Sequence, residues 1–147
     1  MSDIAPHILI VTSRYYEKIV LELEAGVEEA LDRVGATYET IEVPGAFEIP
    51  AAIRMAMDAA EFDGFIGLGC VIRGETSHYD YVCGETARAM MDISLLGTPI
   101  GFGVLTVENQ DQAWVRADRK QKNKGQEIVD ACVAMVNLSH HFSDVDV

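Results

Sequence analysis

The segment from Arg73 to His78, RGETSH, holds the residue types in this chain best suited to chemistry on an anion. Gly74 permits a tight turn, so the backbone amides around it can point at one anion, with the hydroxyls of Thr76 and Ser77 beside them. The imidazole of His78 titrates near neutral pH and can move protons between reaction intermediates. These residues predict a phosphate site next to a general acid-base. A capping or packing histidine is the alternative explanation of His78 taken alone.

Aromatic residues and a carboxylate lie in two other segments that follow predicted strands. VPGAFEIP at 43–50 offers the ring of Phe47 to flank a planar heterocycle and the carboxylate of Glu48 to accept hydrogen bonds from hydroxyls. The alternative is an ordinary turn, with Phe47 in the core and Glu48 at a helix N-terminus. The Tyr15-Tyr16 pair offers either a flat-ligand contact or packing where a helix begins.

The length and net charge of the chain limit the number of domains and the kinds of ligand it can have. A chain of 147 residues fits a single domain over 1–147, and 49% apolar residues are enough for one core. Acidic residues outnumber basic ones 24 to 11, so the net charge of −13 repels nucleic acid and anionic membranes. An anionic substrate therefore needs a specific basic site, for which Arg73, Arg116 and Lys124 are candidates. Exposed charges without a ligand are the alternative for Arg116 and Lys124.

Several classes of protein are disfavoured by missing motifs. The chain has no apolar run of membrane-spanning length and no basic leader, which predicts a cytoplasmic protein. Cys70, Cys83 and Cys132 are widely spaced and form neither a CxxC nor a zinc pattern, so we expect reduced, structural cysteines. The absence of GxxxxGK[ST] and of GxGxxG after the first strand disfavours nucleotide hydrolysis and dinucleotide binding.

Hydrophobic periodicity predicts strands that alternate with helices. The strands are expected at 7–12, 38–43, 65–71 and 99–106, and the helices at 17–34, 49–60, from the end of RGETSHYD to Ile93, and at 111–117 and 124–141. In the first helix Ile19, Leu23 and Val27 face inward and Glu24 is assigned to the outer, polar face with Glu28 and Asp32. In the last helix the inward positions are Ile128, Cys132, Met135 and Val136.

This alternation predicts a three-layer α/β/α sandwich around a four-stranded parallel sheet of the flavodoxin-like kind. Ligands of such sheets bind at the carboxyl edge of the strands. The segments VPGAFEIP, GCVIRGETSHYD and GFGVLTVEN all lie there.

Taken together, four segments resemble one family, the lumazine synthases. They are VPGAFEIP at 43–50, GCVIRGETSHYDYV at 69–82, GFGVLTVEN at 101–109 and NKG at 123–125, and the match runs in order along nearly the whole chain. The resemblance implies a transferase of riboflavin biosynthesis that condenses 5-amino-6-(D-ribitylamino)uracil with 3,4-dihydroxy-2-butanone 4-phosphate. The products are 6,7-dimethyl-8-ribityllumazine, phosphate and water, and neither a metal nor an organic cofactor is implied.

The resemblance also implies roles for individual residues. His78 matches the catalytic proton-transfer histidine, and Arg116 binds phosphate together with the amide loop of Gly74, Glu75 and Thr76. The implied substrate-binding residues are Tyr15, Ala46, Phe47, Glu48, Ile49, Val71, Ile72, Phe102 and Lys124, of which Phe102 comes from a neighbouring subunit.

The family pattern further implies a homopentamer with sites between adjacent subunits, and twelve such rings form a 60-subunit shell in some members. The segment ADRKQKNKG at 117–125 differs from the AGTKAGNKG-like linker of shell-forming members, which favours a free pentamer. Tyr16 stands where many members have asparagine, so that polar contact is missing. There are two competing hypotheses. One is a flavin- or lumazine-binding scaffold without turnover, and the other is a flavodoxin-like redox or signalling domain.

Overall fold

The computed structural model describes residues 5–59 and 61–144, and these residues form a parallel sheet with helices on both faces. The strands are β1 (His7–Thr12), β2 (Thr37–Glu42), β3 (Gly64–Ile72) and β4 (Ile100–Val107), in the order β2-β1-β3-β4. The helices are α1 (Glu17–Arg33), α2 (Ile49–Met57), α3 (His78–Ser94), α4 (Gln110–Ala117) and α5 (Lys124–Asp144), with a 3-10 turn η1 (Ala46–Glu48) before α2.

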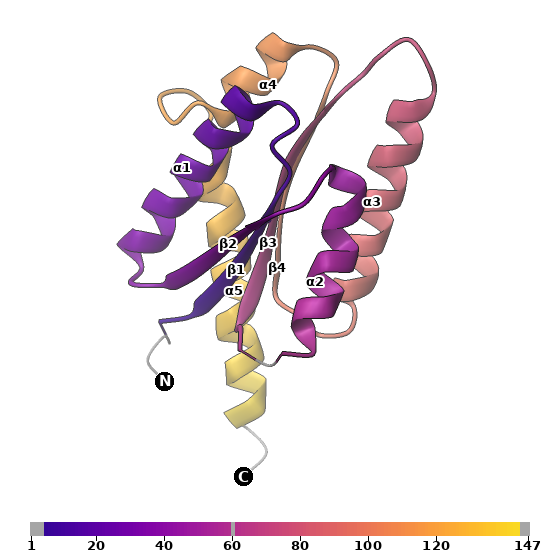
Figure 1. Cartoon of the computed structure of the whole chain (residues 1–147). Coiled ribbons are helices and arrows are strands. Elements are labelled where there is room, and N and C mark those ends of the chain that lie inside the picture. Colours follow the sequence, from indigo (N-terminus) through magenta and orange to yellow (C-terminus); the bar gives the residue numbers. More distant parts are fainter. Residues whose placement is uncertain (1–4, 60, 145–147) are drawn as a thin grey trace.

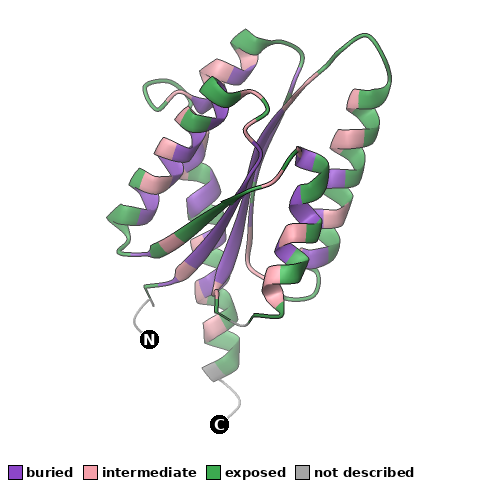
Figure 2. Cartoon of the chain, viewed as in Figure 1, coloured by how far each residue is buried: buried purple, intermediate pink, exposed green. Residues whose placement is uncertain are grey.

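Two apolar cores lie on the two faces of the sheet. Because successive side chains of a strand point to opposite faces, Ile8 and Ile10 pack toward α1 and α5, whereas Leu9 and Val11 pack toward α2 and α3. Figure 1 shows these two helix layers on either side of the sheet, with α4 beside α1. The buried residues follow the central strands and the inner faces of the helices, while β2 at the edge is largely exposed (Figure 2). The predicted three-layer flavodoxin-like sandwich is confirmed.

Most element boundaries differ from the prediction by a few residues at most. Gly35 and Gly97 adopt positive φ angles of 75° and 88° just beyond α1 and α3, a conformation that suits glycine. The structure ends α2 at Met57, earlier than the predicted 60, and Ala60 itself lies outside the described residues. It begins α3 at His78, so the helix already includes the end of the RGETSHYD segment.

Two predicted side-chain orientations are wrong. Glu24 was assigned to the outer face of α1 but is only 4% exposed, because Arg14 and Thr12 donate hydrogen bonds to its carboxylate. Met135 was placed inward in α5 but is 45% exposed, because it lies outside the buried cluster of Cys132 and Val136 and borders a groove between α5 and the end of α3. Amphipathic periodicity identifies a face but cannot see a charged partner from another segment.

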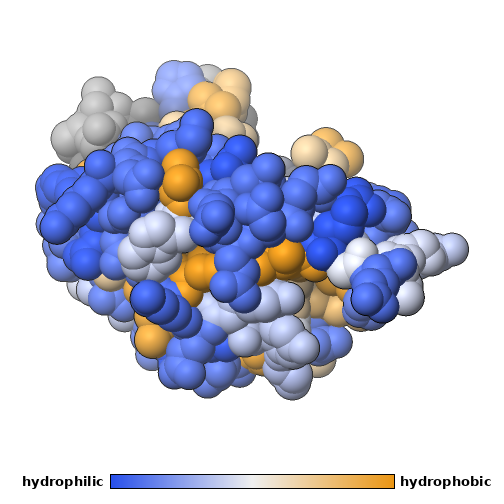
Figure 3. Space-filling model, turned by 90° about the horizontal axis from the view of Figure 1, so that it is seen from above, coloured by the Kyte–Doolittle hydropathy of each residue, from blue (hydrophilic) through white to orange (hydrophobic). Residues whose placement is uncertain are grey.

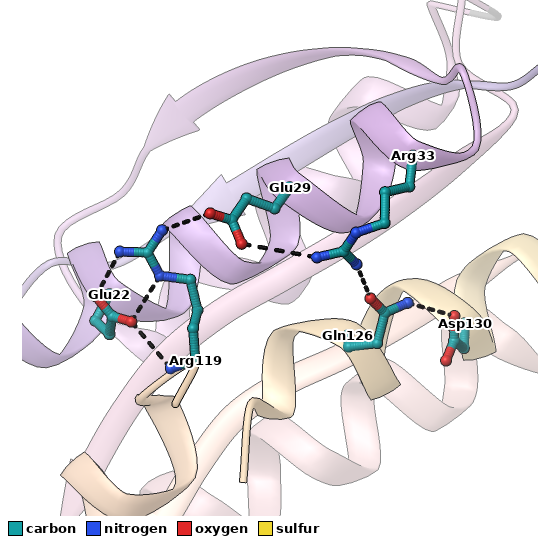
Figure 4. A network of polar contacts seen from close by, with 6 residues as sticks. All are labelled: Glu22, Glu29, Arg33, Arg119, Gln126 and Asp130. Atoms are coloured by element: carbon teal, nitrogen blue, oxygen red, sulfur yellow. Dashed lines mark hydrogen bonds and ion pairs between the residues drawn. The ribbon is translucent and has the colours of Figure 1, made fainter. Parts of the chain in front are cut away.

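Helices α1 and α5 approach each other closely, and a polar network crosses the contact. Gly26 and Gly125 meet there, where a Cβ on Gly125 would lie 2.7 Å from the backbone nitrogen of Val27. Figure 4 shows the network over this contact: Arg119 donates to carboxylates of α1, and Arg33 of α1 donates to α5, with the participants Glu22, Glu29, Arg33, Arg119, Gln126 and Asp130. It ties the turn between α4 and α5 to α1.

Candidate functional site

All four strands run in the same direction, so their carboxyl ends meet at one edge of the sheet. Thr12, Glu42, Ile72 and Val107 are the last residues of the strands, and the backbone amide of Arg73 donates to the carbonyl of Val107 at 3.0 Å. Figure 3 views the molecule from this end and shows a mainly hydrophilic surface with apolar side chains exposed at its centre. The edge therefore offers both apolar and polar contacts to a ligand.

The loop after β1 presents an exposed aromatic ring on a rigid base. Arg14 donates from Nε and Nη2 to the two carboxylate oxygens of Glu24 at 2.9 and 2.8 Å, which fixes the backbone beside Tyr15. Tyr15 is 77% exposed and contacts the edge of the half-buried Tyr16 ring, with centroids 5.0 Å apart. Tyr16 packs against the α1 side of the core. Tyr16 therefore packs where the helix begins, whereas the ring of Tyr15 is exposed and its contact with a flat ligand stays a prediction.

The turn after β2 has two exposed and two buried side chains among residues 46–49. Phe47 is 56% exposed, so the alternative that it packs in the core is wrong. Glu48 is exposed beside it, and Pro50 lies in the first turn of α2, where proline is tolerated. Ala46 and Ile49 are buried, which anchors the turn on the α2 side of the sheet. Ile49 has no exposed surface, so its role in any binding site is to support its neighbours.

The RGETSH segment forms an exposed loop that ends in the first residue of α3. The amide of His78 donates to the hydroxyl of Thr76 at 3.2 Å, and the His78 side chain is exposed. Within the described residues no hydrogen bond is found from the amides of Gly74, Glu75 or Thr76. Free amides beside a helix N-terminus favour an anion, because the helix dipole places partial positive charge there.

Arg73, the first residue of this segment, is not a free cation. Its Nε donates to Glu108 at 2.7 Å, its Nη1 lies 3.3 Å from Asp80, and its guanidinium carbon lies 4.3 Å from the Tyr79 ring centroid. The hydrogen bond to Glu108 raises the pKa of Arg73 above its ordinary value. The expectation that Arg73 is available to recruit an anion is therefore not supported in the chain as it stands.

The other two basic candidates lie on the opposite side of the sheet edge from α3. Arg116 is half-buried near the end of α4, and its Nη1 donates to the carbonyl of Gln112 at 2.9 Å, which leaves its other donors for a ligand. Lys124 begins α5 and lies 3.5 Å from Glu127. Because α4 packs beside α1 and α3 packs beside α2, the helices that carry Arg116 and His78 are on different faces of the sheet (Figure 1).

The remaining candidates belong to the sheet itself. Val71 and Ile72 are half-buried at the end of β3. Phe102 lies on the edge strand β4, is 41% exposed and pairs in register with Gly67, five residues before the end of β4 at Val107. At about 3.3 Å per residue, Phe102 lies roughly 16 Å below the carboxyl edge of its own strand. One chain therefore does not bring Phe102 to the RGETSH loop.

Known proteins match this chain over most of its length. The family model described as 6,7-dimethyl-8-ribityllumazine synthase matches residues 5–140. A protein of that name from Agrobacterium fabrum is 50% identical over 139 residues, covering 90% of this chain and 94% of the relative. The 6,7-dimethyl-8-ribityllumazine synthase of Bartonella tribocorum is 48% identical, covering 95% and 93%.

The chain belongs to the 6,7-dimethyl-8-ribityllumazine synthase family. The resemblance carried by the four motifs is thereby confirmed. A third relative, 6,7-dimethyl-8-ribityllumazine synthase 1 of Rhizobium meliloti, is 49% identical over 145 residues, covering 94% of this chain and 95% of the relative.

Two grooves of the described chain lie apart from the predicted site residues in the loops after β2 and β3. A groove of about 390 Å³ between the end of α3 and the second half of α5 is lined by residues such as Met135, Leu138 and Phe142. A second, of about 500 Å³, lies between α1 and α4 beside Trp114 and Arg119. Neither contains His78 or Phe47. Within the described part of the chain no group of three or more His, Cys, Asp or Glu residues could hold a metal ion. Among the helices of residues 5–59 and 61–144, none combines the length and the apolar character that a membrane span requires.

Two pairs at the edge of this lumazine synthase sheet were missed by the sequence reasoning. Arg73 pairs with Glu108, and Arg14 pairs with Glu24. A signal for the first pair was present, because Arg73 directly follows β3 and Glu108 directly follows the neighbouring strand β4. The second pair gave no such signal, since Glu24 lies a loop and about two helix turns away from Arg14.

Proposed function

We propose that this chain catalyses the condensation of 5-amino-6-(D-ribitylamino)uracil with 3,4-dihydroxy-2-butanone 4-phosphate to 6,7-dimethyl-8-ribityllumazine, with release of phosphate and water, as one domain over residues 1–147. The observation that carries the proposal is the family match over residues 5–140 together with relatives of this name that cover at least nine-tenths of both chains. This is the penultimate step of riboflavin biosynthesis.

His78 is the proposed proton-transfer group. Its imidazole is exposed at the start of α3, beside the amides of Gly74, Glu75 and Thr76 that would hold the phosphate. Proton transfer in imine formation, phosphate elimination and ring closure then takes place next to the leaving group. A positioned acid-base contributes about 10²- to 10⁴-fold, and holding two substrates together supplies much of the rest.

The phosphate and the pyrimidine take different parts of the edge. Arg116 keeps donors free after its bond to Gln112, and a guanidinium suits the phosphate geometrically. Tyr15 and Phe47 offer exposed rings for stacking on the pyrimidine, and Glu48 offers acceptors to the ribityl hydroxyls. Ala46 and Ile49 support this turn, Val71 and Ile72 line the sheet beneath, and Lys124 stands near the substrates.

The active unit is proposed to be a homopentamer, with each site completed by Phe102 of the adjacent chain. Support comes from the position of Phe102 on β4, too far below the edge to join its own loop, and from exposed apolar side chains on α3 and just beyond it, Tyr81, Met91, Leu95 and Leu96. Such a surface is typical of an interface. We propose a free pentamer and not a 60-subunit shell, because the turn that begins at Asp118 is tied to its own α1 through Arg119.

We also propose a cytoplasmic location, because free cysteines fit a reducing compartment.

The test follows lumazine absorbance when purified protein is mixed with both substrates. We expect product from the wild-type chain and, from His78→Ala, turnover reduced by about 10²-fold or more with substrate binding largely retained. His141→Ala is the matched control, because this exposed histidine lies near the end of α5. Tight flavin binding without product would instead indicate a binding scaffold. Unchanged turnover in His78→Ala would remove the role of His78, and sedimentation measures the pentamer.

A further inference from the structure

Arg73 joins three elements that each hold part of the proposed site. Its backbone leads from β3 into the amide loop 74–76, and its side chain contacts Tyr79 and Asp80 in the first turn of α3. The same guanidinium donates to Glu108, which directly follows β4. The structure thus connects loop, helix start and the β4–α4 junction through one side chain.

The contacts on Tyr79 and Asp80 act directly on the position of His78. These two residues follow His78 in the first turn of α3, where the backbone has no preceding helical turn to hold it. The cation-π contact holds the guanidinium over the Tyr79 ring, and the ion pair with Asp80 links the helix start to the end of β3. The loop 74–77 between these anchors is exposed and has no packing of its own.

The contact with Glu108 extends the same link toward Arg116. The amide of Glu108 donates to the side chain of Gln112 at 2.8 Å, and Asn109 accepts the amide of Gln112 at 2.9 Å as the cap of α4. The carbonyl of Gln112 in turn accepts from Arg116. A continuous series of contacts therefore runs from the start of α3, through Arg73 and Glu108, to the arginine proposed to bind phosphate.

Charge separates Arg73 from a phosphate ligand. Two carboxylates face its single positive charge, so the cluster of Arg73, Asp80 and Glu108 is net negative and would repel a phosphate. Arg116, by contrast, forms no ion pair with a carboxylate in the described part of the chain, and its recorded side-chain hydrogen bond goes to a backbone carbonyl. The planar fork of Arg73 is instead used on two acceptors and one ring, a combination that lysine cannot reproduce.

We propose that Arg73 is a positioning residue, which sets the place of His78 and of the anion-binding amides through its contacts with Asp80, Tyr79 and Glu108 and does not itself bind substrate. This inference rests on the proposed function for the identity of the reaction. The structural part of the inference, that Arg73 sets the position of His78, does not depend on which reaction the chain catalyses.

The test compares Arg73→Gln and Arg73→Lys with Arg54→Gln, which removes an exposed ion pair with Asp58 on α2. We expect both Arg73 variants to lose about ten- to hundredfold in kcat, since small misplacements of reacting groups cost that much, with KM for the pyrimidine within about twofold. Inhibition by inorganic phosphate should weaken by a similar factor in both. The unfolding midpoint should fall by no more than about 4 °C, because ion pairs between exposed side chains contribute little to stability.

Lysine is the decisive variant. A lysine retains the point charge that binds phosphate but loses the fork, so wild-type kcat and phosphate inhibition in Arg73→Lys would overturn the proposal in favour of a direct ligand. If Arg73→Gln does not fold, Glu108→Gln replaces it and should lower kcat in the same direction. The double variant Arg73→Gln, Glu108→Gln should be no slower than Arg73→Gln alone, and additive losses would show that the two residues act separately.

A readout independent of turnover keeps this proposal distinct from the proposed function. The imidazole resonance of His78, assigned by its absence in His78→Ala, should shift in both Arg73 variants and stay in place in Arg54→Gln. An unshifted resonance overturns the positioning role even if the chain makes lumazine. A shifted resonance without product from the wild-type chain supports the positioning role and overturns the reaction.

Discussion

Removing Arg14 is predicted to destabilise the fold by leaving a buried carboxylate without its partner. Glu24 is 4% exposed and receives three hydrogen bonds, two from Arg14 at 2.8 and 2.9 Å and one from the Thr12 hydroxyl at 3.0 Å. Arg14→Met keeps much of the apolar stem and removes the charge. Breaking one side of a buried pair costs about 3–5 kcal/mol. Since Arg14 is about one-third exposed, we expect the lower end, about 3 kcal/mol.

The double variant Arg14→Met, Glu24→Leu tests the cause. It removes the buried charge as well and leaves only the Thr12 hydroxyl unpaired, so most of the loss should be recovered, to within about 1 kcal/mol of wild type. Equilibrium denaturation measures both variants at one protomer concentration, because assembly adds to apparent stability. For a chain of this size, 3 kcal/mol corresponds to a fall of roughly 6–12 °C in Tm.

Two results would refute this reasoning. A loss below about 1 kcal/mol in Arg14→Met would mean that water reaches Glu24 and replaces the guanidinium. A double variant as unstable as the single one would mean that the stem of Arg14, and not the unpaired carboxylate, stabilises the loop. The exposed Arg54→Met is the control, expected within about 0.5 kcal/mol of wild type.

Three further outcomes are expected. Gly125→Ala should destabilise the chain by about 1–3 kcal/mol or more, because its Cβ would meet the backbone of α1, whereas Gly84→Ala in open space on α3 should stabilise it by about 0.5–1 kcal/mol in the same denaturation assay. Hydrogen bonds from Arg119 lower the pKa of the Glu22 carboxyl below its ordinary 4.5. The stabilisation by this pair is therefore present above pH 4.5 and is lost as the pH falls through the folded-state pKa. Glu22→Gln should flatten the acid side of a curve of Tm against pH, and an unaltered curve would contradict the role of this pair. Burial raises the pKa of the Cys132 thiol to about 12, so mass spectrometry should find it alkylated only after unfolding.

Local patterns predicted the order and type of the elements because apolar periodicity reports directly on burial. The run HILIVT reads as a buried strand, and the structure buries Ile8, Leu9, Ile10 and Val11 almost completely. The sequence also predicted that the polar and aromatic residues after β2 and β3 lie at one edge of the sheet, since parallel strands place such loops there. The family followed from the motifs, because four segments in order are far more specific than any one.

Tertiary structure decided which polar residues are paired and how deep they lie. The helix pattern put Glu24 outside, yet Arg14 from the preceding loop buries it, because a charge becomes tolerable inside once a partner satisfies it. Arg73 and Glu108 each directly follow a strand, which places both at the carboxyl edge, but their contact depends on β3 and β4 being neighbours in the sheet. Local sequence patterns therefore suffice for the layers of the fold and for the chemical groups at the sheet edge. The pairing of Arg73 with Glu108, and the distance of Phe102 from the RGETSH loop of its own chain, emerge only in the folded protein, because both depend on distances in space.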